Sequence, residues 1–268
     1  MSRSNSYVIR GGLEGRERLR VLARIMHASS ASLFDRCGLR DGVHCLDAGC
    51  GGGDATLELA RRVAPNGTVV GVDIDEQKIR IARDEARQQG FANADFRVSD
   101  VRDVPGPPAF DFAYARFLLT HLSDPAGAVG ALHGQLRPGG ILCVEDIDFS
   151  GHFTHPESAA FLRYHTLYCA TVTRRGGDPN VGPRLPALLQ RAGFHDVTVT
   201  VVQPMALQGE AKFISPLTLE NIAGAILEDG LASQAEIDQL VRALYAFAAD
   251  PHTLAGMPRI FQVWGRRG

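Results

Sequence analysis

Residues 43–60 read VHCLDAGCGGGDATLELA, a run of glycines between two apolar segments. Residues 43–46 are short and mostly apolar, as a buried strand is, and residues 54–63 return to apolar side chains at helical spacing. Between them, glycines let the backbone pass close to a ligand, and the free N–H groups at the start of the helix favour an anionic group. This stretch therefore predicts a strand, a nucleotide-binding loop and a helix.

The form of the loop separates it from the dinucleotide fingerprint. That fingerprint, G-x-G-x-x-G, requires a glycine where this chain has Asp54. The loop instead reads D-x-G-x-G-x-G from Asp47 to Gly53, and this form resembles motif I of the class I S-adenosylmethionine-dependent methyltransferases. A Rossmann-like protein for another nucleotide is the alternative.

Four later stretches resemble further motifs of this family, in the same order. VVGVD at residues 69–73 looks like the second strand with its terminal acid, and FRVSDV at 96–101 looks like the third motif. FDFAYARFLLTHL at 110–122 looks like the fourth strand and the helix after it, and LRPGGILCVED at 136–146 looks like the loop and the fifth strand. With the glycine loop, these core motifs span residues 39–149.

Strand and helix patterns alternate through this part of the chain. Apolar runs typical of strands lie at residues 43–46, 69–73, 94–98, 110–115 and 141–146. The alternation predicts an α/β protein with a parallel, doubly wound sheet, which binds ligands at the carboxyl ends of its strands. Two more strands are expected at 197–202 and 260–265, and in the family the last two strands form an antiparallel edge pair. The expected fold is therefore a mostly parallel, seven-stranded, Rossmann-like methyltransferase sheet.

Helical patterns outside the core motifs suggest a cap over the site. One long helix or two shorter ones are expected within residues 13–39. Further helices are expected at 157–175, 220–227 and 233–248, and we interpret the segments at about 150–182 and 207–256 as helical cap segments. No linker or internal repeat is evident, so residues 1–268 are expected to form one domain.

Composition narrows the class of protein. The 268 residues have a formal net charge of −2, which does not suggest nucleic-acid binding. No apolar run approaches the length of a membrane span, and the N-terminus does not resemble a signal peptide. The five cysteines are scattered without C-x-x-C spacing, which favours reduced thiols and argues against a zinc site. We expect a cytoplasmic protein with a small-molecule partner, no nucleic acid, no membrane and no metal; the oligomeric state stays open.

The resemblance implies S-adenosylmethionine as the methyl donor and assigns its methionine end. Gly49, Gly51 and Gly53 would pass close to this end, and Asp47 would reach the ammonium group through water. Arg116 would face the amino-acid part through its backbone. In many relatives a tyrosine near the N-terminus closes over the donor carboxylate, a role that fits Tyr7; the alternative is a tyrosine that anchors the terminus.

The resemblance also assigns the ribose and adenine ends. Asp73 would accept both ribose hydroxyls, which suits a carboxylate. Ile74 would pack on the adenine face, Asp100 would accept from the adenine amino group, and Val101 would offer its backbone N–H. The alternative for each acidic residue is a structural loop cap.

Transfer of the methyl group needs positioning more than chemical activation. A base is required only when the acceptor carries its proton at neutral pH. His121, one turn into the expected helix after strand four, is the first candidate, because histidine titrates near neutrality. Orientation of the donor and simple packing are the alternatives for His121. His152 and His155 are the next candidates, and three acidic residues also lie near the ends of strands four and five, namely Glu145, Asp146 and Asp148.

An aromatic face on the helix after strand five is the candidate acceptor pocket. Phe161, Tyr164, His165, Tyr168 and Val172 recur at three- and four-residue spacing, so they share one side of that helix. A mostly apolar pocket with a few polar groups is the usual site for a small ligand, and we predict Phe161, Tyr164 and Tyr168 as substrate-binding residues. The alternative is that they pack the helix onto the rest of the cap.

The sequence therefore predicts an enzyme that transfers a methyl group to a small molecule. O-methylation is the first expectation, with N- and C-methylation open. Strand four does not end in the Asn/Asp-Pro-Pro-Tyr/Phe signature used for amide and nucleobase N-methylation. The alternative function is a protein that binds S-adenosylmethionine without transferring its methyl group, as a regulator or a non-methylating enzyme.

Overall fold

A seven-stranded sheet in the order β3-β2-β1-β4-β5-β10-β7 forms the centre of the computed structural model, which describes residues 13–268. Its strands are β1 (His44–Ala48), β2 (Thr68–Asp73), β3 (Ala94–Val98), β4 (Phe110–Arg116), β5 (Leu136–Asp148), β7 (Phe194–Val202) and β10 (Arg259–Arg267). Strands β1 to β5 pair in parallel, and β10 runs antiparallel to both of its neighbours, β5 and β7. The predicted mostly parallel, doubly wound sheet is confirmed. Strand order reverses between β1 and β4, the place where such sheets bind ligands.

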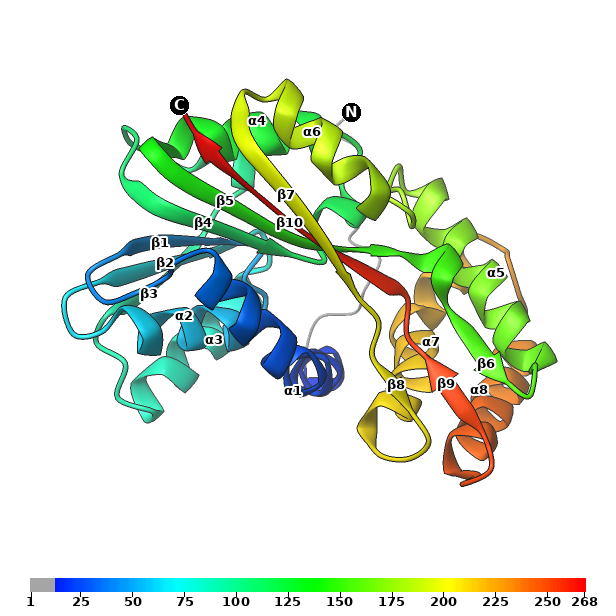
Figure 1. The fold of residues 1–268 in the computed structure, drawn as a ribbon. Coiled ribbons are helices and arrows are strands. Elements are labelled where there is room, and N and C mark those ends of the chain that lie inside the picture. Colours follow the sequence, from blue (N-terminus) through cyan, green and yellow to red (C-terminus); the bar gives the residue numbers. More distant parts are fainter. Residues whose placement is uncertain (1–12) are drawn as a thin grey trace.

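Helices cover both faces of this sheet. Helices α1 (Leu13–Arg36), α2 (Asp54–Val63) and α3 (Glu76–Gln88) lie on one face, and α4 (Pro125–Gln135) and α6 (Leu185–Arg191) lie on the other (Figure 1). The apolar sides of the central strands pack against both layers. On the α1 side, the Phe34 ring meets the rings of Phe112 and Tyr114 edge-on.

Capping side chains begin three of the helices. Asp75 accepts hydrogen bonds from the N–H groups of the first turn of α3, and Asp124 does so for α4, with Pro125 in the first turn. Ser233 accepts from the N–H of Glu236 at the start of α8 (Gln234–Ala249). These caps satisfy N–H groups that the helices cannot bond internally.

Three further helices pack together beyond the carboxyl ends of the central strands. Helices α5 (Ala159–Arg174), α7 (Glu210–Glu228) and α8 share one apolar cluster with the end of β5 (Figure 1). Helix α7 also packs against α1, which reaches it from the other side of the sheet end. We call α5, α7 and α8 the cap helices.

The structure differs from the sequence expectations in three places. A second, three-stranded sheet joins β6 (Phe153–His155), β9 (Leu254–Gly256) and β8 (Met205–Ala206), which are too short to show periodicity. Helix α7 begins ten residues before the expected residue 220 and continues through Pro216, a residue that usually ends a helix. After β4 the chain makes only a 3₁₀ turn, Leu119–His121, before Asp124 caps α4. Within residues 13–268, no helix is long and apolar enough to cross a membrane.

Candidate active site

The glycine loop, residues 49–53, leads from β1 into α2. Gly49, Gly51 and Gly53 have φ angles of 70°, 54° and 88°, a region that strains other residues. The N–H groups of Gly49 and Cys50 both donate to the carbonyl of Val72, at 2.8 and 3.0 Å. The loop is therefore held against the end of β2 by its backbone.

Asp73 ends β2 and accepts one backbone N–H on each carboxylate oxygen. Oδ2 accepts from Gly51 at 3.0 Å, and Oδ1 accepts from Asp75 at 2.9 Å. Each oxygen keeps another lone pair, and Asp73 lines the cavity described below. The arrangement leaves this carboxylate able to accept two hydroxyl groups.

Asp47 lies near the end of β1 and is almost fully buried. Its Oδ2 accepts a hydrogen bond from Thr56 Oγ1 at 2.6 Å. Burial raises the pKa of Asp47 to about 6, and the hydrogen bond from Thr56 and the charge of Arg116 oppose this rise. The carboxylate is therefore mostly ionised at neutral pH, and it can attract a cationic group.

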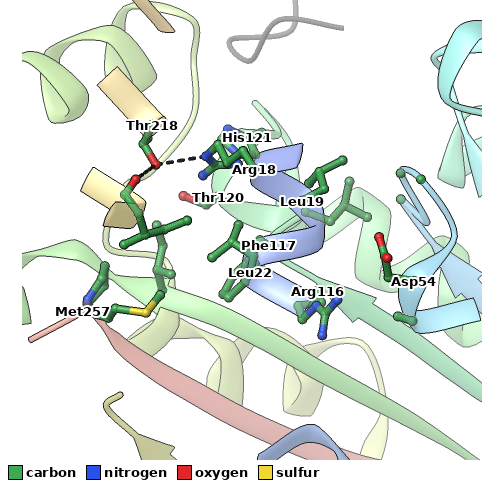
Figure 2. A pocket seen from close by; sticks show the side chains of 18 of the residues that line it. Arg18, Leu19, Leu22, Asp54, Arg116, Phe117, Thr120, His121, Thr218 and Met257 are labelled. Atoms are coloured by element: carbon green, nitrogen blue, oxygen red, sulfur yellow. Dashed lines mark hydrogen bonds between the residues drawn. The ribbon is translucent and has the colours of Figure 1, made fainter. Parts of the chain in front are cut away.

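One cavity of about 1080 Å³, counted with its mouth, joins the glycine loop to the cap helices. Asp47, Gly49, Gly51, Asp73 and Arg116 line it at the sheet end. Phe149, His152, Tyr164, Tyr168, Ile214 and Thr218 line it opposite, and α1 adds Arg18, Leu19 and Leu22 (Figure 2). The acidic groups and the side-chain-free loop at the sheet end fit the ammonium, ribose hydroxyls and close backbone approach that S-adenosylmethionine requires.

Four predicted donor residues lie outside the walls of this cavity. Ile74 is 51% exposed, and Val101 is buried elsewhere. The Asp100 carboxylate accepts from Arg102 Nε and Nη2 at 3.0 and 2.6 Å and caps a 3₁₀ turn, which matches the loop-cap alternative. Gly53 is required by packing, because a Cβ there would lie 3.0 Å from Ala82 and Phe96. The adenine contacts thus stay predictions, and Tyr7 lies outside the described residues.

The chain directly after β4 is strained where it borders the cavity. Phe117 has a φ of 53°, unusual for a residue with a bulky side chain, and its N–H donates to Glu145 O at 2.8 Å. The next residue, Leu118, leaves no room for a side chain at Gly49, whose Cβ would lie 2.9 Å away. Backbone strain of this kind concentrates at functional sites.

Two predicted histidines line the cavity, and both are neutral at physiological pH. Burial lowers the pKa of His121 to about 3, helped by the charges of Arg18 and Lys78. Burial also lowers the pKa of His152 to about 3, with a smaller effect of His165. The Nδ1 atom of His152 is buried and makes no hydrogen bond to residues 13–268.

The other base candidates are engaged elsewhere. The buried carboxylate of Glu145 accepts from Ser30 Oγ at 2.6 Å, from Gln262 Nε2 at 2.7 Å and from the Tyr114 hydroxyl. Asp146 accepts the N–H of Thr120 at 3.1 Å, and Asp148 pairs with Arg259 at 2.7 Å. These acids bind the end of β5 to neighbouring elements and do not line the cavity. The exposed His155 does not line it either.

The aromatic face of α5 divides between the cavity and the core. Tyr164 and Tyr168 line the cavity, and the Tyr168 ring stacks on Phe149 with 3.9 Å between ring centroids. Burial raises the pKa of both tyrosines, so their hydroxyls stay protonated. Phe161 does not line the cavity; it is buried beside His152, with 4.5 Å between ring centroids and an angle of 80° between the rings. Two of the three predicted residues therefore line the cavity, and their contact with a substrate stays a prediction.

Several residues that line the cavity were not predicted from the sequence. Arg18 on α1 donates from Nε to Thr218 Oγ1 on α7 at 2.9 Å, across 200 positions of sequence. Lys78, Phe117 and Met257 also line the cavity. No local pattern marks a contact between such distant residues. Among residues 13–268, no group of three or more His, Cys, Asp or Glu side chains could hold a metal ion.

Comparison with known proteins gives consistent matches. The family model described as "Methyltransferase domain" matches residues 39–175, more than half of the chain. Trans-aconitate 2-methyltransferase of Delftia acidovorans is 30% identical over 256 residues, which cover 89% of this chain and 92% of that protein. Ubiquinone/menaquinone biosynthesis C-methyltransferase UbiE of Teredinibacter turnerae is 31% identical over 137 residues, 50% of this chain and 53% of that protein. The YcgJ protein of Bacillus subtilis, 18% identical, superimposes with a TM-score of 0.61 over 90% of this chain and 98% of its own, a likeness of fold alone.

Proposed function

Because the chain belongs to the class I S-adenosylmethionine-dependent methyltransferases, we propose that it methylates an oxygen atom of a small molecule held between the glycine loop and the cap helices. The observation that carries this proposal is the single cavity that joins Asp73 and the glycine loop to the aromatic side chains of α5. A donor and an acceptor in one cavity can be held at near-attack distance, which supplies much of the acceleration in such a displacement.

The sheet end of the cavity would hold the donor. Asp73 offers lone pairs to the ribose hydroxyls, Asp47 attracts the ammonium group, and Gly49 and Gly51 line the cavity with backbone alone. S-adenosylmethionine, when bound, supplies an electrophilic methyl group whose bond to sulfur breaks with the electron pair staying on sulfur, which gives S-adenosylhomocysteine.

We propose His152 as the group that receives the proton of an acceptor hydroxyl. It is neutral, its Nδ1 is buried without a hydrogen-bond partner in residues 13–268, and it lines the cavity. His121 is the second candidate: its pKa is as low as that of His152, and the charges of Arg18 and Lys78 add to burial in disfavouring the imidazolium that proton transfer would create. A proton acceptor at this place supports an oxygen nucleophile that is protonated at neutral pH.

The acceptor is proposed to be small and partly apolar. Leu22, Phe149, Ile214 and Met257 give the cap end apolar walls, and tyrosine hydroxyls supply a few polar groups. Trans-aconitate 2-methyltransferase of Delftia acidovorans, which aligns over 89% of this chain, is named for a small molecule. We also infer a cytoplasmic location and no nucleic-acid partner, supported by the near-neutral charge and by five cysteines that form no disulfide.

Methyl-labelled donor tests the proposal. The protein is incubated with carbon-13-methyl S-adenosylmethionine and an extract of small metabolites, and labelled products are identified by mass spectrometry. The carbon-13 chemical shift of the transferred methyl tells oxygen from nitrogen or carbon attachment. Label on oxygen, lost with Asp73→Ala, supports the proposal. Label on nitrogen or carbon contradicts the oxygen assignment, and S-adenosylhomocysteine binding with no labelled product identifies a donor-binding protein that does not transfer methyl.

A further inference from the structure

A buried arginine faces the cavity without an acidic partner among residues 15–268. Arg18 is only 8% exposed, and it lines the cavity from α1. Its hydrogen bond within residues 15–268 is the one from Nε to the neutral Thr218 hydroxyl, and no carboxylate of residues 15–268 lies within ion-pair distance. A buried charge is costly unless it is paired, so this guanidinium needs an explanation.

The neighbouring arginines on α1 show how such a charge is usually compensated, by an ion pair with a carboxylate. Arg16 pairs with Asp54 and with Glu85, the latter at 3.0 Å, and Arg20 pairs with Glu85 at 2.8 Å. Arg24, whose side chain is 49% exposed, pairs with Glu210 at 2.6 Å. Arg18 is thus buried like Arg16 but lacks the carboxylates that compensate Arg16.

The surroundings hold the Arg18 guanidinium in place and leave its outer amino groups available. Thr218 donates its hydroxyl to the carbonyl of Ile214 at 2.6 Å, so its oxygen presents a lone pair to Arg18 Nε. The two Nη groups make no hydrogen bond to residues 15–268 and belong to a side chain that lines the cavity. A planar guanidinium with two free amino groups matches the geometry of an oxyanion.

The neighbours of Arg18 show where it lies within the cavity. It stands beside His121 and Thr218 and away from Asp54 (Figure 2). Asp47 and Asp73, which suit the cationic and hydroxyl groups of the donor, line the glycine-loop end. The charge of Arg18 lowers the pKa of His121, and it opposes the rise in the pKa of Tyr164 and Tyr168, so this end has a positive potential.

We propose that Arg18 binds a carboxylate of the methyl acceptor, which makes the substrate a small organic acid with an apolar body. This inference rests on the methyl transfer proposed above. The apolar walls around Arg18, including Leu22, Phe149 and Ile214, accommodate the body of the acid. The carboxylate supplies the negative charge that the cavity lacks at this end.

Separation of the candidate substrates by charge tests the proposal. The metabolite extract is separated by anion exchange into anionic and neutral pools, and each is incubated with methyl-labelled donor. We expect label in the anionic pool, and Arg18→Gln to lower kcat/KM for the labelled acid about 10- to 100-fold, the range of a hydrogen bond to a charged group. Arg18→Lys should recover part of this loss, and Arg20→Gln, on the same helix and paired with Glu85, serves as the matched control.

Binding of S-adenosylhomocysteine and melting temperature separate the other roles of Arg18. The affinity for S-adenosylhomocysteine should not change in Arg18→Gln, and the melting temperature should not fall, because no carboxylate of residues 15–268 loses a partner. Should Arg18→Gln fail to fold, Thr218→Val keeps the charge but releases Nε, and it should raise the KM of the acid. A loss of donor affinity with normal acceptor KM would assign Arg18 to the donor. Label confined to the neutral pool, or transfer to acids that ignores Arg18→Gln, would overturn the inference and leave methyl transfer standing.

A direct binding assay covers the case in which no methyl is transferred. Protein loaded with S-adenosylhomocysteine is melted with salicylate or malate and with the matching amides. Stabilisation by the acids alone, absent in Arg18→Gln, retains the carboxylate site although the proposed transfer has failed. If acids and amides stabilise the protein equally, or if neither does, both the carboxylate site and the proposed methyl transfer are rejected.

Discussion

Oδ2 of Asp73 accepts a hydrogen bond from the backbone N–H of Gly51 at 3.0 Å. This bond joins the end of β2 to the middle of the glycine loop, which follows β1. One carboxylate therefore shapes the loop and also lines the cavity that the loop borders. Loss of the Asp73 side chain should damage donor binding both directly and through the loop.

Replacement of Asp73 by alanine should weaken the binding of S-adenosylhomocysteine by about 2–3 kcal/mol, the value of hydrogen bonds to a charged group. Calorimetric titration of the purified protein measures the loss. Asp100→Ala is the matched control, because the Asp100 carboxylate is bound by Arg102 outside the cavity, and it should lose less affinity. An Asp73 variant with normal affinity would remove this residue from the donor site.

Donor affinity should fall as the pH is lowered through about 6, where burial places the pKa of Asp47. Only the ionised carboxylate attracts the donor ammonium, so affinity should drop up to about tenfold per pH unit below that value. The sign for stability is opposite: a folded pKa raised from 3.8 means that the free protein loses stability from this group as the pH rises through this interval. The dissociation constant of S-adenosylhomocysteine between about pH 5 and pH 8 checks the prediction.

Two variants identify Asp47 as the titrating group. Asp47→Asn should bind weakly with little pH dependence. Thr56→Val removes the hydrogen bond that favours the charged carboxylate, so its midpoint should move to higher pH. A midpoint that stays in place in Thr56→Val would assign the titration to another group.

The sheet was predictable because its signals are local and periodic. The five parallel strands and the two at the edge lie close to the apolar runs in the sequence, and the D-x-G-x-G-x-G loop occurs where β1 meets α2. The small sheet of β6, β8 and β9 gave no such signal, since strands of two or three residues have no readable period and pair over long distances. The first half of α7 was missed because Pro216 interrupts it.

The donor end of the site was more predictable than the acceptor end for a related reason. Asp47, the glycines and Asp73 sit directly at strand ends, so sequence position fixes their place in space. The acceptor end is assembled from α1, α5 and α7, and its Arg18–Thr218 contact exists only after the chain has folded. Burial also changes the pKa values of side chains, and a sequence does not show this change. The histidines at positions 121 and 152 are examples, because burial keeps both of them neutral.

His152→Asn should lower kcat about 10²-fold and leave the affinity for S-adenosylhomocysteine unchanged, as expected for loss of a proton acceptor. His121→Asn should have a smaller effect, because cations next to His121 disfavour its protonation. The exposed His155 provides the control, and His155→Asn should keep full activity. The wild-type kcat should show no inflection near pH 6.5, since both cavity histidines titrate near 3. A larger loss in His121→Asn than in His152→Asn would reverse the assignment.

Phe161 and Tyr168 share one face of α5 but should respond to truncation in opposite ways. Phe161 is buried away from the cavity, so Phe161→Ala should cost about 3–5 kcal/mol of unfolding free energy. Tyr168→Phe removes only a hydroxyl, which makes no hydrogen bond to residues 13–268, while the ring keeps its stacking on Phe149. Its melting temperature should stay near that of the wild type, and the acceptor KM should rise about threefold to tenfold, the loss of one neutral hydrogen bond.

Thermal melts and acceptor KM of both variants test this division between a core residue and a cavity residue. Unchanged KM in Tyr168→Phe would make this tyrosine a packing residue, and a stable Phe161→Ala would show that its site is not part of the core.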